Sequence, residues 1–362
     1  MTRFVHILSN VTYGGGEQVL YNLCREKPDD NFLFLLRKSN QVPLLNNINN
    51  HSPFKSRDVY TKKDYFFTII YFLVLLVNLK LNKKKFDCFV LHGFPCQYIL
   101  FLLDLLFPKK KKLMIYHQIK HYHKGIKSII RFIEVFLLFI SSAKIGAPSH
   151  RSIYSLKNYI PKFMWKKFSF FLFKNCFTPI IENNKSKILF NEINLLNSKR
   201  PYILTVARFE DFKGQIRLVK FIERNYLLKN KLNFIFIGDG KNFQDCLKFK
   251  EEKNLSNIFL IGSKPRNSLF NVYKNCLGVF IASYEEAFGV AIVEAQSFKK
   301  PVFVFEPSLK INRNIHILDE DKKSYNIEDF KKMISWYEIP EEEKFVYSTS
   351  DTFISLEKQI KF

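Results

Sequence analysis

The stretch VFIASYEEAFGVAIVEA, Val279–Ala295, sets a short apolar strand directly before a helix that opens near Gly289. The same order, an apolar strand followed by a polar turn, recurs in YILTVARFEDFKG (Tyr202–Gly214) and in NFIFIGDG (Asn233–Gly240). Strands that are apolar throughout, rather than alternating with polar residues, are typical of parallel sheets covered by helices on both faces. These segments therefore predict an α/β fold.

The alternation of strands and helices extends outward over both halves of the chain. A chain of 362 residues exceeds what one core usually supports, so we expect two domains. The predicted boundaries are a first Rossmann-like domain over 1–185, a polar linker over 186–200, a second Rossmann-like domain over 201–310 and closing helices over 311–362. Further strands are predicted at Arg3–Leu8, Phe32–Arg37, Cys88–Leu91, Leu113–Tyr116, Lys144–Ala147, Ile258–Ile261 and Val302–Phe305.

The cysteines and the N-terminus indicate a cytoplasmic setting. The six cysteines are scattered, without a C-x-x-C pair or metal-ligand spacing, which favours a reducing compartment over a disulfide framework. The opening apolar stretch is too short for a signal-peptide core and reads as the first strand. The apolar segment Tyr65–Leu79 is shorter than the roughly 20 residues of a membrane-spanning helix.

The charge balance, 57 Lys and Arg against 33 Asp and Glu, gives a formal net charge of +24 and indicates an anionic partner. Nucleic acid and an anionic membrane surface both fit that charge. Two acid-free regions favour the membrane: one holds the run Lys109–Lys112, and the other holds KFMWKKFSFFLFKN, Lys162–Asn175, where aromatic rings and lysines alternate. The alternative for each region is a core element with solvated lysines.

Polar residues follow several predicted strands of the second half, where open α/β sheets bind their ligands. Arg208 and Lys213 supply positive charge, which stabilises a departing diphosphate without a metal. Glu286 lies just before a predicted helix and Glu294 lies within it, so both can accept hydrogen bonds from sugar or ribose hydroxyls. Gly289 lets a phosphate approach the amides of the helix N-terminus. Each residue alone has an ordinary structural explanation; their joint order at strand ends favours a nucleotide-sugar site.

These motifs resemble the family 4 retaining glycosyltransferases, which have the GT-B architecture, and they look most like the bacterial surface-polysaccharide enzymes. The resemblance is strongest over Tyr202–Phe305. Its motifs there are EAFGVAIVE (Glu286–Glu294) with Pro301-Val302, Arg208 with Lys213-Gly214, the turn Gly238-Asp239-Gly240, and Tyr273. In the first half the matching residues are Gly14-Gly15-Gly16-Glu17, His92-Gly93, His117 and Ala147-Pro148-Ser149.

The resemblance implies a GT-B fold, in which two Rossmann-like domains with parallel sheets face each other across a cleft. It implies that Arg208 and Lys213 hold the donor diphosphate, that Glu294 holds the ribose, and that Glu286 contacts the donor sugar without being a nucleophile. His117 would contact the donor sugar or the acceptor. The remaining substrate-binding positions are the loop Gly14, Gly15 and Gly16 on the phosphates, the backbone near Lys264 on the base, and Gly238, Phe288 and Gly289.

The sequence departs from the family pattern at two small residues. Ala207 and Ala287 stand where the family has glycine, and both are small enough to keep the turns. The G-x-G-x-x-G loop of dinucleotide-binding proteins is absent. A structural role, as a hydrogen-bonded histidine, is an open alternative for His117 and is favoured for His92. The acidic triplet Asp319–Asp321 is interpreted as a solvated loop rather than a metal site.

The sequence thus predicts a glycosyltransferase that moves a sugar, with retention of configuration, from a nucleotide-diphosphate sugar to a glycan or lipid-linked glycan acceptor. Surface polysaccharide synthesis (lipopolysaccharide, O-antigen or capsule) is the expected process. The enzyme is expected to be metal-independent, to need no cofactor, and to lie on the inner face of the cell membrane. A catalytically silent GT-B protein that binds glycan and a basic nucleic-acid-binding protein are the alternatives. The donor sugar, the base and the acceptor stay open.

Overall fold

The structure of the chain is a computed structural model that describes residues 2–8, 15–35, 77, 86–93, 96–117, 127–197, 200–225, 231–306, 309, 315–322, 325, 329, 332 and 349–360. The chain forms two compact units. The first comprises residues 1–178 and 347–362, and the second comprises residues 179–346. Each is described by itself.

The first unit contains a parallel sheet in the order β2-β1-β3-β4-β5-β6. Its strand order reverses between β1 and β3, which is the position where open α/β sheets bind ligands beyond the carboxyl ends of their strands. The strands are β1 (Phe4–Leu8), β2 (Asn31–Leu35), β3 (Cys88–His92), β4 (Lys111–Ile115), β5 (Lys144–Ala147) and β6 (Phe170–Leu172).

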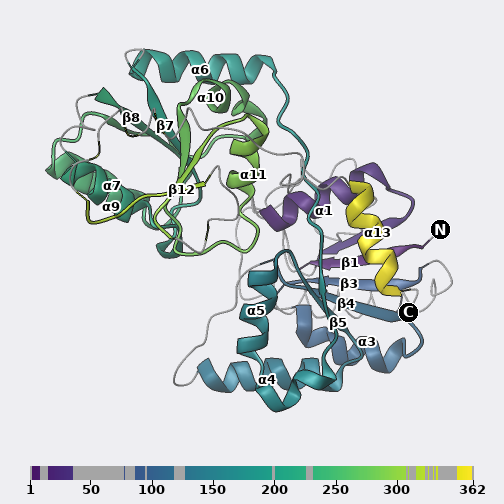
Figure 1. Cartoon of the computed structure of the whole chain (residues 1–362). Helices are drawn as coiled ribbons and strands as arrows, with labels where there is room; N and C mark the ends of the chain where they lie inside the picture. Colours follow the sequence, from purple (N-terminus) through teal and green to yellow (C-terminus); the bar gives the residue numbers. More distant parts are fainter. Residues whose placement is uncertain are drawn as a thin grey trace. The chain divides into compact units, whose positions relative to one another are not determined.

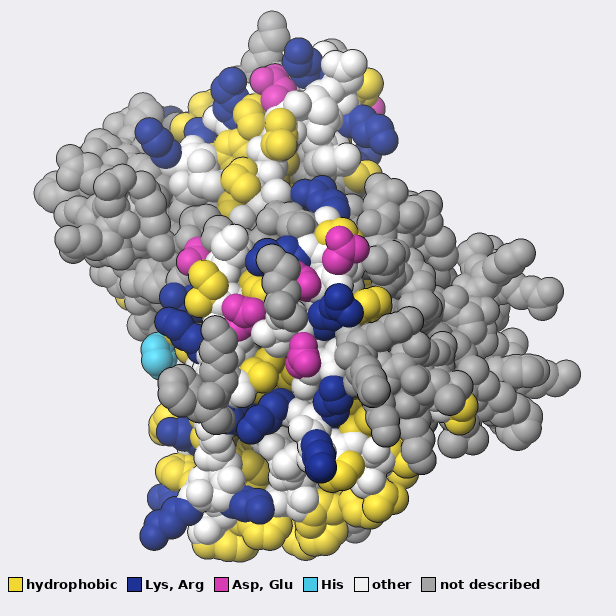
Figure 2. Space-filling view, turned by 90° about the vertical axis from the view of Figure 1, so that its right-hand side faces the viewer, with side chains coloured by type: hydrophobic (Ala, Val, Ile, Leu, Met, Phe, Trp, Pro, Cys, Tyr) yellow, Lys and Arg dark blue, Asp and Glu magenta, His cyan; other side chains and the backbone are white. Residues whose placement is uncertain are grey.

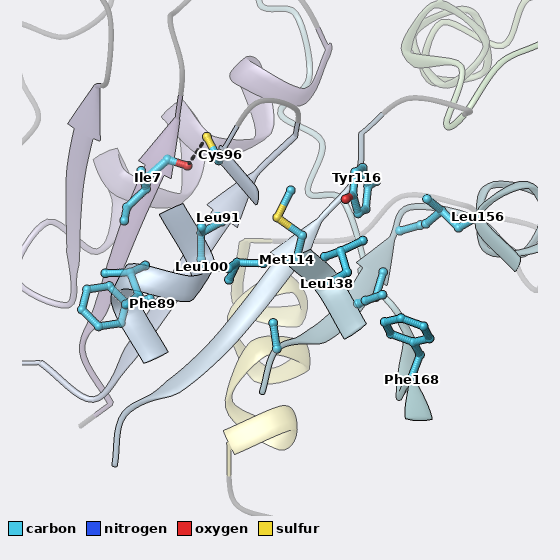
Figure 3. Close-up of a cluster of buried hydrophobic side chains, with 14 of the residues drawn as sticks. Ile7, Phe89, Leu91, Cys96, Leu100, Met114, Tyr116, Leu138, Leu156 and Phe168 are labelled. Atoms are coloured by element: carbon cyan, nitrogen blue, oxygen red, sulfur yellow. Dashed lines mark hydrogen bonds between the residues drawn. The ribbon is translucent and has the colours of Figure 1, made fainter. Parts of the chain in front are cut away.

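Helices cover both faces of this sheet (Figure 1). On one face α1 (Gly15–Glu26) and the C-terminal helix α13 (Thr349–Ile360) pack together, and Phe353 of α13 meets Phe4 of β1 edge to face. On the other face lie η3 (Cys96–Ile99), α3 (Leu100–Leu106), α4 (Lys127–Ile140), α5 (His150–Tyr159) and η4 (Lys162–Lys167). Figure 3 shows the core on that second face, where the Cys96 thiol approaches the carbonyl of Ile7.

The second unit contains a parallel sheet in the order β12-β11-β10-β7-β8-β9. Counted from its first strand this is the Rossmann order 3-2-1-4-5-6, and it reverses between β7 and β10. The strands are β7 (Tyr202–Val206), β8 (Asn233–Ile237), β9 (Ile258–Leu260), β10 (Gly278–Ile281), β11 (Val302–Val304) and β12 (Ile315–Ile317).

Two hydrophobic layers hold the helices of the second unit against its sheet. One layer joins the sheet to α7 (Gln215–Arg224) and α9 (Phe243–Glu252). The other joins it to α6 (Asn184–Asn197), α10 (Phe270–Asn275) and α11 (Val290–Ser297). The remaining short helices are η5 (Asp211–Lys213) and η6 (Arg266–Ser268). The α/β class and the two parallel sheets predicted from the sequence are confirmed.

The division of the chain differs from the predicted boundaries in two places. The predicted linker 186–200 is mostly α6, because Leu189 and Ile193 are buried against the second sheet. The last predicted closing helix exists as α13, but it belongs to the first unit, because Phe353 and Leu356 fill the core beside β1. Most of the predicted closing region before α13 falls outside the described residues, as does most of the apolar segment Tyr65–Leu79.

The segment Lys162–Asn175, in which we expected membrane-facing rings, is mostly core structure. Phe168, Phe171 and Phe173 are buried, and β6 runs through the middle of the segment. Figure 3 places Phe168 within the core of the first unit. Phe163 is the exception, with an exposed fraction of 85%. The lysines of this segment lie in η4 and after β6, whereas β6 itself is FFL.

The run Lys109–Lys112 is likewise not a simple basic patch. Lys112 is fully buried, pairs with Asp104 at 2.9 Å and donates to the carbonyl of Phe107 at 2.7 Å. Lys110 donates to the carbonyl of Phe86. Lys109 and Lys111 are exposed, so half of the run forms internal contacts of β4.

All six cysteines are free and buried. In the part of the chain that the structure describes, no helix combines the length and the apolar character needed to cross a membrane.

Candidate functional site

The strand ends of the second unit are joined by backbone hydrogen bonds into one surface at the carboxyl edge of the sheet. The amide of Gly238 donates to the carbonyl of Gly262 at 2.9 Å, which joins the turns after β8 and β9. The amide of Phe209 donates to the carbonyl of Asp239, also at 2.9 Å. The amide of Tyr284 donates to the carbonyl of Phe212 at 3.0 Å, so the loop after β10 is tied to the loop after β7.

Two glycines make these close approaches possible. Gly214, with φ +68°, lies so near β10 that an added Cβ would come within 2.3 Å of the Ala282 carbonyl oxygen. At Gly238, with φ +146°, an added Cβ would lie 1.9 Å from the carbonyl oxygen of Ala207. Both positions combine a backbone conformation that favours glycine with contact against neighbouring backbone. The loops that carry Arg208, Lys213 and Glu286 are therefore held in fixed relation.

Lys213 and Glu286 form an ion pair within this surface. The Lys213 Nζ lies 2.5 Å from Glu286 Oε1, and the Ser283 hydroxyl donates to the same oxygen at 2.7 Å. Both charged side chains are mostly buried, at 17% and 16% exposed. Phe212 adds its ring 5.2 Å from the Lys213 ammonium. The cation predicted from the β7 loop and the carboxylate predicted from the β10 loop are therefore in direct contact.

Arg208 lies on the same edge in a different environment. The residue is exposed, and its backbone carbonyl accepts from the Gln215 side chain at 2.7 Å, which fixes the chain between β7 and α7. Within the described part of the chain its guanidinium forms no ion pair. Arg208 thus adds a second positive charge on the edge that carries the Lys213–Glu286 pair.

Glu294 belongs to a second, separate cluster. It is 4% exposed and accepts through both oxygens, from Arg266 Nε at 2.6 Å and from the Tyr273 hydroxyl at 2.7 Å. Burial together with the Glu294 carboxylate raises the pKa of Tyr273 well above its ordinary value. A carboxylate has about four acceptor sites, so Glu294 keeps acceptor capacity for a ligand hydroxyl. Arg266 was not predicted, because its partner is 28 residues away in sequence.

The start of α11 fits an anion-binding helix terminus. Gly289 caps the helix in a left-handed conformation and is buried, and the half-buried Phe288 precedes it. The first amides of a helix carry partial positive charge and bind phosphate. The Lys264 side chain, in contrast, turns to Glu192 of α6 at 3.9 Å. Only its backbone neighbour Gly262 takes part in the joined turns.

In the first unit the predicted loop Gly14–Gly16 is only partly visible. Gly14 falls outside the described residues, whereas Gly15 and Gly16 begin α1. His117 follows β4, and its Nε2 lies 2.9 Å from Nδ1 of His92. The structural role favoured for His92 agrees with its burial at 2% exposure.

Among the described residues, no three His, Cys, Asp or Glu side chains are arranged so that they could hold a metal ion. In the acidic triplet Asp319–Asp321, Glu320 is paired with Arg217, which also pairs with Glu306 at 2.9 Å. The interpretation of the triplet as a loop outside the site agrees with these contacts, although Glu320 is tied to α7 rather than free in solvent.

The fold and these strand-end loops define a protein of the GT-B class. The HepE protein of Anabaena, solved with UDP and glucose, superposes with a TM-score of 0.71 over 100% of both chains at 13% identity. A likeness at that identity establishes the fold alone. The predicted GT-B architecture is thereby confirmed.

The family follows from the second unit. Residues 186–344, which lie within the second unit, match the family model described as "Glycosyl transferases group 1". The resemblance drawn from the motifs between Arg208 and Glu294 is confirmed over that segment.

Two curated relatives match part of the chain. The first is the N,N'-diacetylbacillosaminyl-diphospho-undecaprenol alpha-1,3-N-acetylgalactosaminyltransferase of Campylobacter jejuni, 28% identical over 131 residues, which is 36% of this chain and 33% of that protein. The second is the O-antigen chain mannosyltransferase C of Escherichia coli, 25% identical over 125 residues, 34% of this chain and 31% of that protein. The chain thus spans about a third of the length of the curated relatives it matches.

Proposed function

We propose that this chain is a glycosyltransferase that transfers a sugar from a nucleoside-diphosphate sugar to a glycan or lipid-linked glycan in surface polysaccharide synthesis. The observation that carries the proposal is the Lys213–Glu286 pair at the β7/β10 reversal of a group 1 glycosyl transferase domain. Relatives named for lipid-linked and O-antigen acceptors support the acceptor class. The HepE structure with UDP and glucose supports the donor class.

The proposed chemistry assigns charge stabilisation to Arg208 and Lys213. The departing diphosphate gains negative charge as the glycosidic bond breaks, and fixed cations stabilise that charge without reorganisation. An ammonium has three donors, so Lys213 can hold Glu286 and a phosphate oxygen together. Under this proposal the enzyme works without a metal, and chelation by EDTA leaves the rate unchanged.

Glu286 is proposed to bind the donor sugar, not to attack it. Its Oε1 is occupied by Lys213 and Ser283, so Oε2 is the oxygen through which a sugar hydroxyl would bind. We propose transfer with retention by a front-face route, in which the leaving phosphate helps to deprotonate the acceptor hydroxyl. That route needs a stabilised phosphate and an oriented acceptor, and no carboxylate nucleophile.

Nucleotide binding tests the proposal directly. A thermal-shift panel of UDP, GDP, CMP, ADP and dTDP is measured on the wild type, on Glu294→Ala and on Glu252→Ala. Ligand at about 100 times its dissociation constant adds roughly 2.7 kcal/mol of stability. One nucleotide is expected to raise the melting temperature of the wild type and of Glu252→Ala, whose carboxylate is exposed on α9 and pairs with Lys248 of the same helix. Glu294→Ala is expected to lose the shift. If no nucleotide binds, while short duplex DNA binds with a steep salt dependence, the proposal is wrong.

We also propose that the first unit docks on an anionic membrane surface through the apolar side of α3 and α4. The two helices pack together, and their outward side chains are exposed instead of covered. The exposed fraction reaches 67% at Leu105 and 71% at Phe132. The apolar side consists of Phe101, Leu102, Leu105, Phe132, Ile133, Phe136 and Ile140. In Figure 2 hydrophobic side chains gather along the lower edge of the molecule, with lysines and arginines beside them.

Exposed lysines accompany this apolar side. Lys166 and Lys167 of η4 are exposed, and the Lys167 ammonium lies 5.8 Å from the ring of Phe139 in α4. Apolar side chains with lysines at their margin match an interfacial membrane-binding surface.

Flotation with vesicles of phosphatidylglycerol, compared with vesicles of phosphatidylcholine alone, tests the membrane proposal. The double variant Phe132→Ser/Phe136→Ser is expected to lose binding and Ile181→Ser, exposed on the second unit, to keep it. Equal flotation of all three proteins on both lipids would remove the membrane proposal.

A further inference from the structure

Four polar side chains form a diagonal row across the first sheet. Asn31 begins β2, His6 lies within β1, His92 ends β3 and His117 follows β4. Each member of the row lies on, or in the case of His117 just beyond, the strand next to the previous member's strand and two residues closer to the carboxyl edge. The strand register shows this, because Asn31 is paired with Phe4, His92 with Leu8 and Ile115 with His92. Residues two apart along a strand point to the same face, so the row lies on one face of the sheet.

Hydrogen bonds join the whole row. His6 Nε2 lies 2.9 Å from Asn31 Oδ1, His6 Nδ1 lies 3.0 Å from His92 Nε2, and His92 Nδ1 lies 2.9 Å from His117 Nε2. The rings of His92 and His117 are 9° from parallel, with centroids 5.2 Å apart. That centroid separation matches two rings meeting edge to edge in one plane, the geometry of a direct N–H···N bond, and not two stacked faces.

The Asn31 amide decides which nitrogen donates and which accepts in the hydrogen bonds of the row. Its Nδ2 donates to the carbonyls of Lys27 at 2.8 Å and Leu23 at 3.4 Å, so the two amide protons are taken. The flipped amide would set an oxygen against two carbonyl oxygens. Oδ1 therefore faces His6 and can only accept, which requires the proton of His6 to sit on Nε2.

The direction passes along the row because each histidine is neutral. Burial lowers the pKa of His6 and of His117 to about 4. Burial, with the neighbouring imidazoles, places the pKa of His92 well below its ordinary value. A neutral imidazole has one donor and one acceptor nitrogen. With Nε2–H on His6, its Nδ1 accepts from His92 Nε2–H, and His92 Nδ1 accepts from His117 Nε2–H.

At the end of the row stands an unused acceptor. His117 Nδ1 is buried and has no hydrogen-bond partner among the residues that the structure describes. We propose that Asn31, His6 and His92 are positioning residues that lock His117 in its Nε2–H tautomer and so present the bare Nδ1 as a fixed acceptor for a sugar hydroxyl. The identity of the ligand rests on the proposed function; the tautomer does not.

The tautomer decides which role a bound sugar hydroxyl takes. A bare Nδ1 accepts the O–H proton, whereas the opposite tautomer would donate its N–H to the hydroxyl oxygen. Without the row, His117 would exchange between the two tautomers, as solvated imidazoles do. Holding one of them removes the reorganisation that hydroxyl binding would otherwise require.

Nitrogen NMR of the full chain labelled with ¹⁵N-histidine tests the tautomer directly, without substrate. At pH 7 we expect His6, His92 and His117 each to show a protonated Nε2 and a bare Nδ1, assigned through the single variants of each histidine. A His117 that carries its proton on Nδ1, or that averages between tautomers, overturns the proposal.

Two matched asparagines test the role of the amide. Asn31→Leu removes the acceptor that sets the direction, and we expect the His117 resonances to move to the averaged or reversed tautomer. Asn225→Leu is the control, because Asn225 is also fully buried, donates to the carbonyls of Phe221 and Lys322 and accepts from the amide of Tyr325. It contacts no histidine of the row and should leave these resonances unchanged. Unchanged tautomers in Asn31→Leu would show that the amide does not set them.

Sugar-dependent stabilisation separates positioning from mere packing. The probes are UDP-glucose, UDP-galactose, UDP-N-acetylglucosamine and GDP-mannose, each against its nucleoside diphosphate. In His92→Phe we expect the extra melting shift given by the sugar to vanish while the nucleotide shift stays. His92→Gln, whose amide offers one donor and one acceptor, should restore it. A sugar-dependent shift that persists in His92→Phe contradicts the positioning role. If no probe binds the wild type, the proposed function fails, and the NMR result still decides the tautomer.

Discussion

The carboxyl edges of the two sheets differ in their electrostatics, one being charged and the other neutral. In the second unit the edge is built from charges: Lys213 pairs with Glu286, and Arg266 pairs with Glu294. In the first unit the edge ends in neutral imidazoles, because burial depresses the pKa of His6 and His117. Charged groups suit a phosphate, whereas a neutral acceptor suits a hydroxyl. Both sheets are six-stranded and parallel, and the side chains at the strand ends set the chemistry.

The largest expected effect comes from removing a charge at the second edge. Lys213→Ala should lower kcat/KM by about 10²–10³-fold, the size seen when one group that stabilises developing negative charge is lost. Consumption of the donor identified by the nucleotide panel measures it. Lys220→Ala, an exposed lysine on the neighbouring α7, is the control and should retain full activity. Equal rates for the two variants would remove Lys213 from the mechanism.

Because its buried histidines are neutral, we expect the first unit to lose stability in acid. His6 takes up a proton near pH 6.5 when unfolded but only near pH 4 when folded. The unfolded state therefore binds more protons between these values, so the free energy of unfolding falls as pH is lowered from 6.5 to 4. The slope is about 1.4 kcal/mol per pH unit for each such histidine.

Urea unfolding followed by Trp165 fluorescence measures this slope, in a Trp336→Phe background so that the only tryptophan lies in the first unit. His6→Gln should flatten the profile by about one proton. A profile that stays equally steep in the variant would mean that His6 is not the group that titrates.

The packing at the two edges can be compared at two glycines that have similar backbone conformations. Gly214 and Gly93 have φ of +68° and +67°, but a Cβ at Gly214 meets the Ala282 carbonyl oxygen at 2.3 Å, whereas a Cβ at Gly93 meets nothing within 4 Å. Gly93→Ala should cost about 1 kcal/mol through strain alone, and Gly214→Ala should cost about 1–3 kcal/mol more through the clash. Far-UV circular dichroism in urea measures both; similar losses would refute the tight approach at Gly214.

The smallest expected effects are on stability, and they distinguish two lysines of the run Lys109–Lys112. Lys112→Ala removes the partner of Asp104 and leaves the Phe107 carbonyl without its donor, at a cost of about 1–3 kcal/mol. Lys109→Ala, at an exposed position, should change stability by less than about 0.5 kcal/mol. Thermal unfolding of the two variants makes the comparison. A Lys109 loss as large as that of Lys112 would show that exposure does not distinguish them.

The second unit was the easier half to predict, and particular residues show why. The runs Tyr202–Val206 and Asn233–Ile237 are mostly apolar and do not alternate with polar residues, and the structure has strands with those same limits. The polar residues after them were identifiable because strand ends in an open sheet share one edge. The edge strands β6 (FFL) and β12 (IHI) were missed: β6 lies in a stretch where aromatic residues are interleaved with lysines, and β12 has a polar residue at its centre.

The candidate site was predictable in composition but not in pairing. The motif at Glu286 and Glu294 indicated two carboxylates, and the structure gives each its own cation, Lys213 and Arg266. The partners of an ion pair that are 73 residues apart cannot be matched by sequence spacing. His6 was missed for the same reason, although a polar residue inside the apolar strand FVHIL was a signal.

The sequence by itself determined the α/β class, the two parallel sheets and the resemblance of the second unit to the group 1 glycosyl transferases, because hydrophobic periodicity and strand-end motifs are local properties of the chain. Only the tertiary structure decided which lysines are buried, which rings are exposed, and how Asn31, His6, His92 and His117 align. Those outcomes depend on strand order and register, which bring distant residues to one face of a sheet. The direction of that row depends on a further nonlocal fact: two carbonyls of α1 and the following turn hold the Asn31 amide in one orientation.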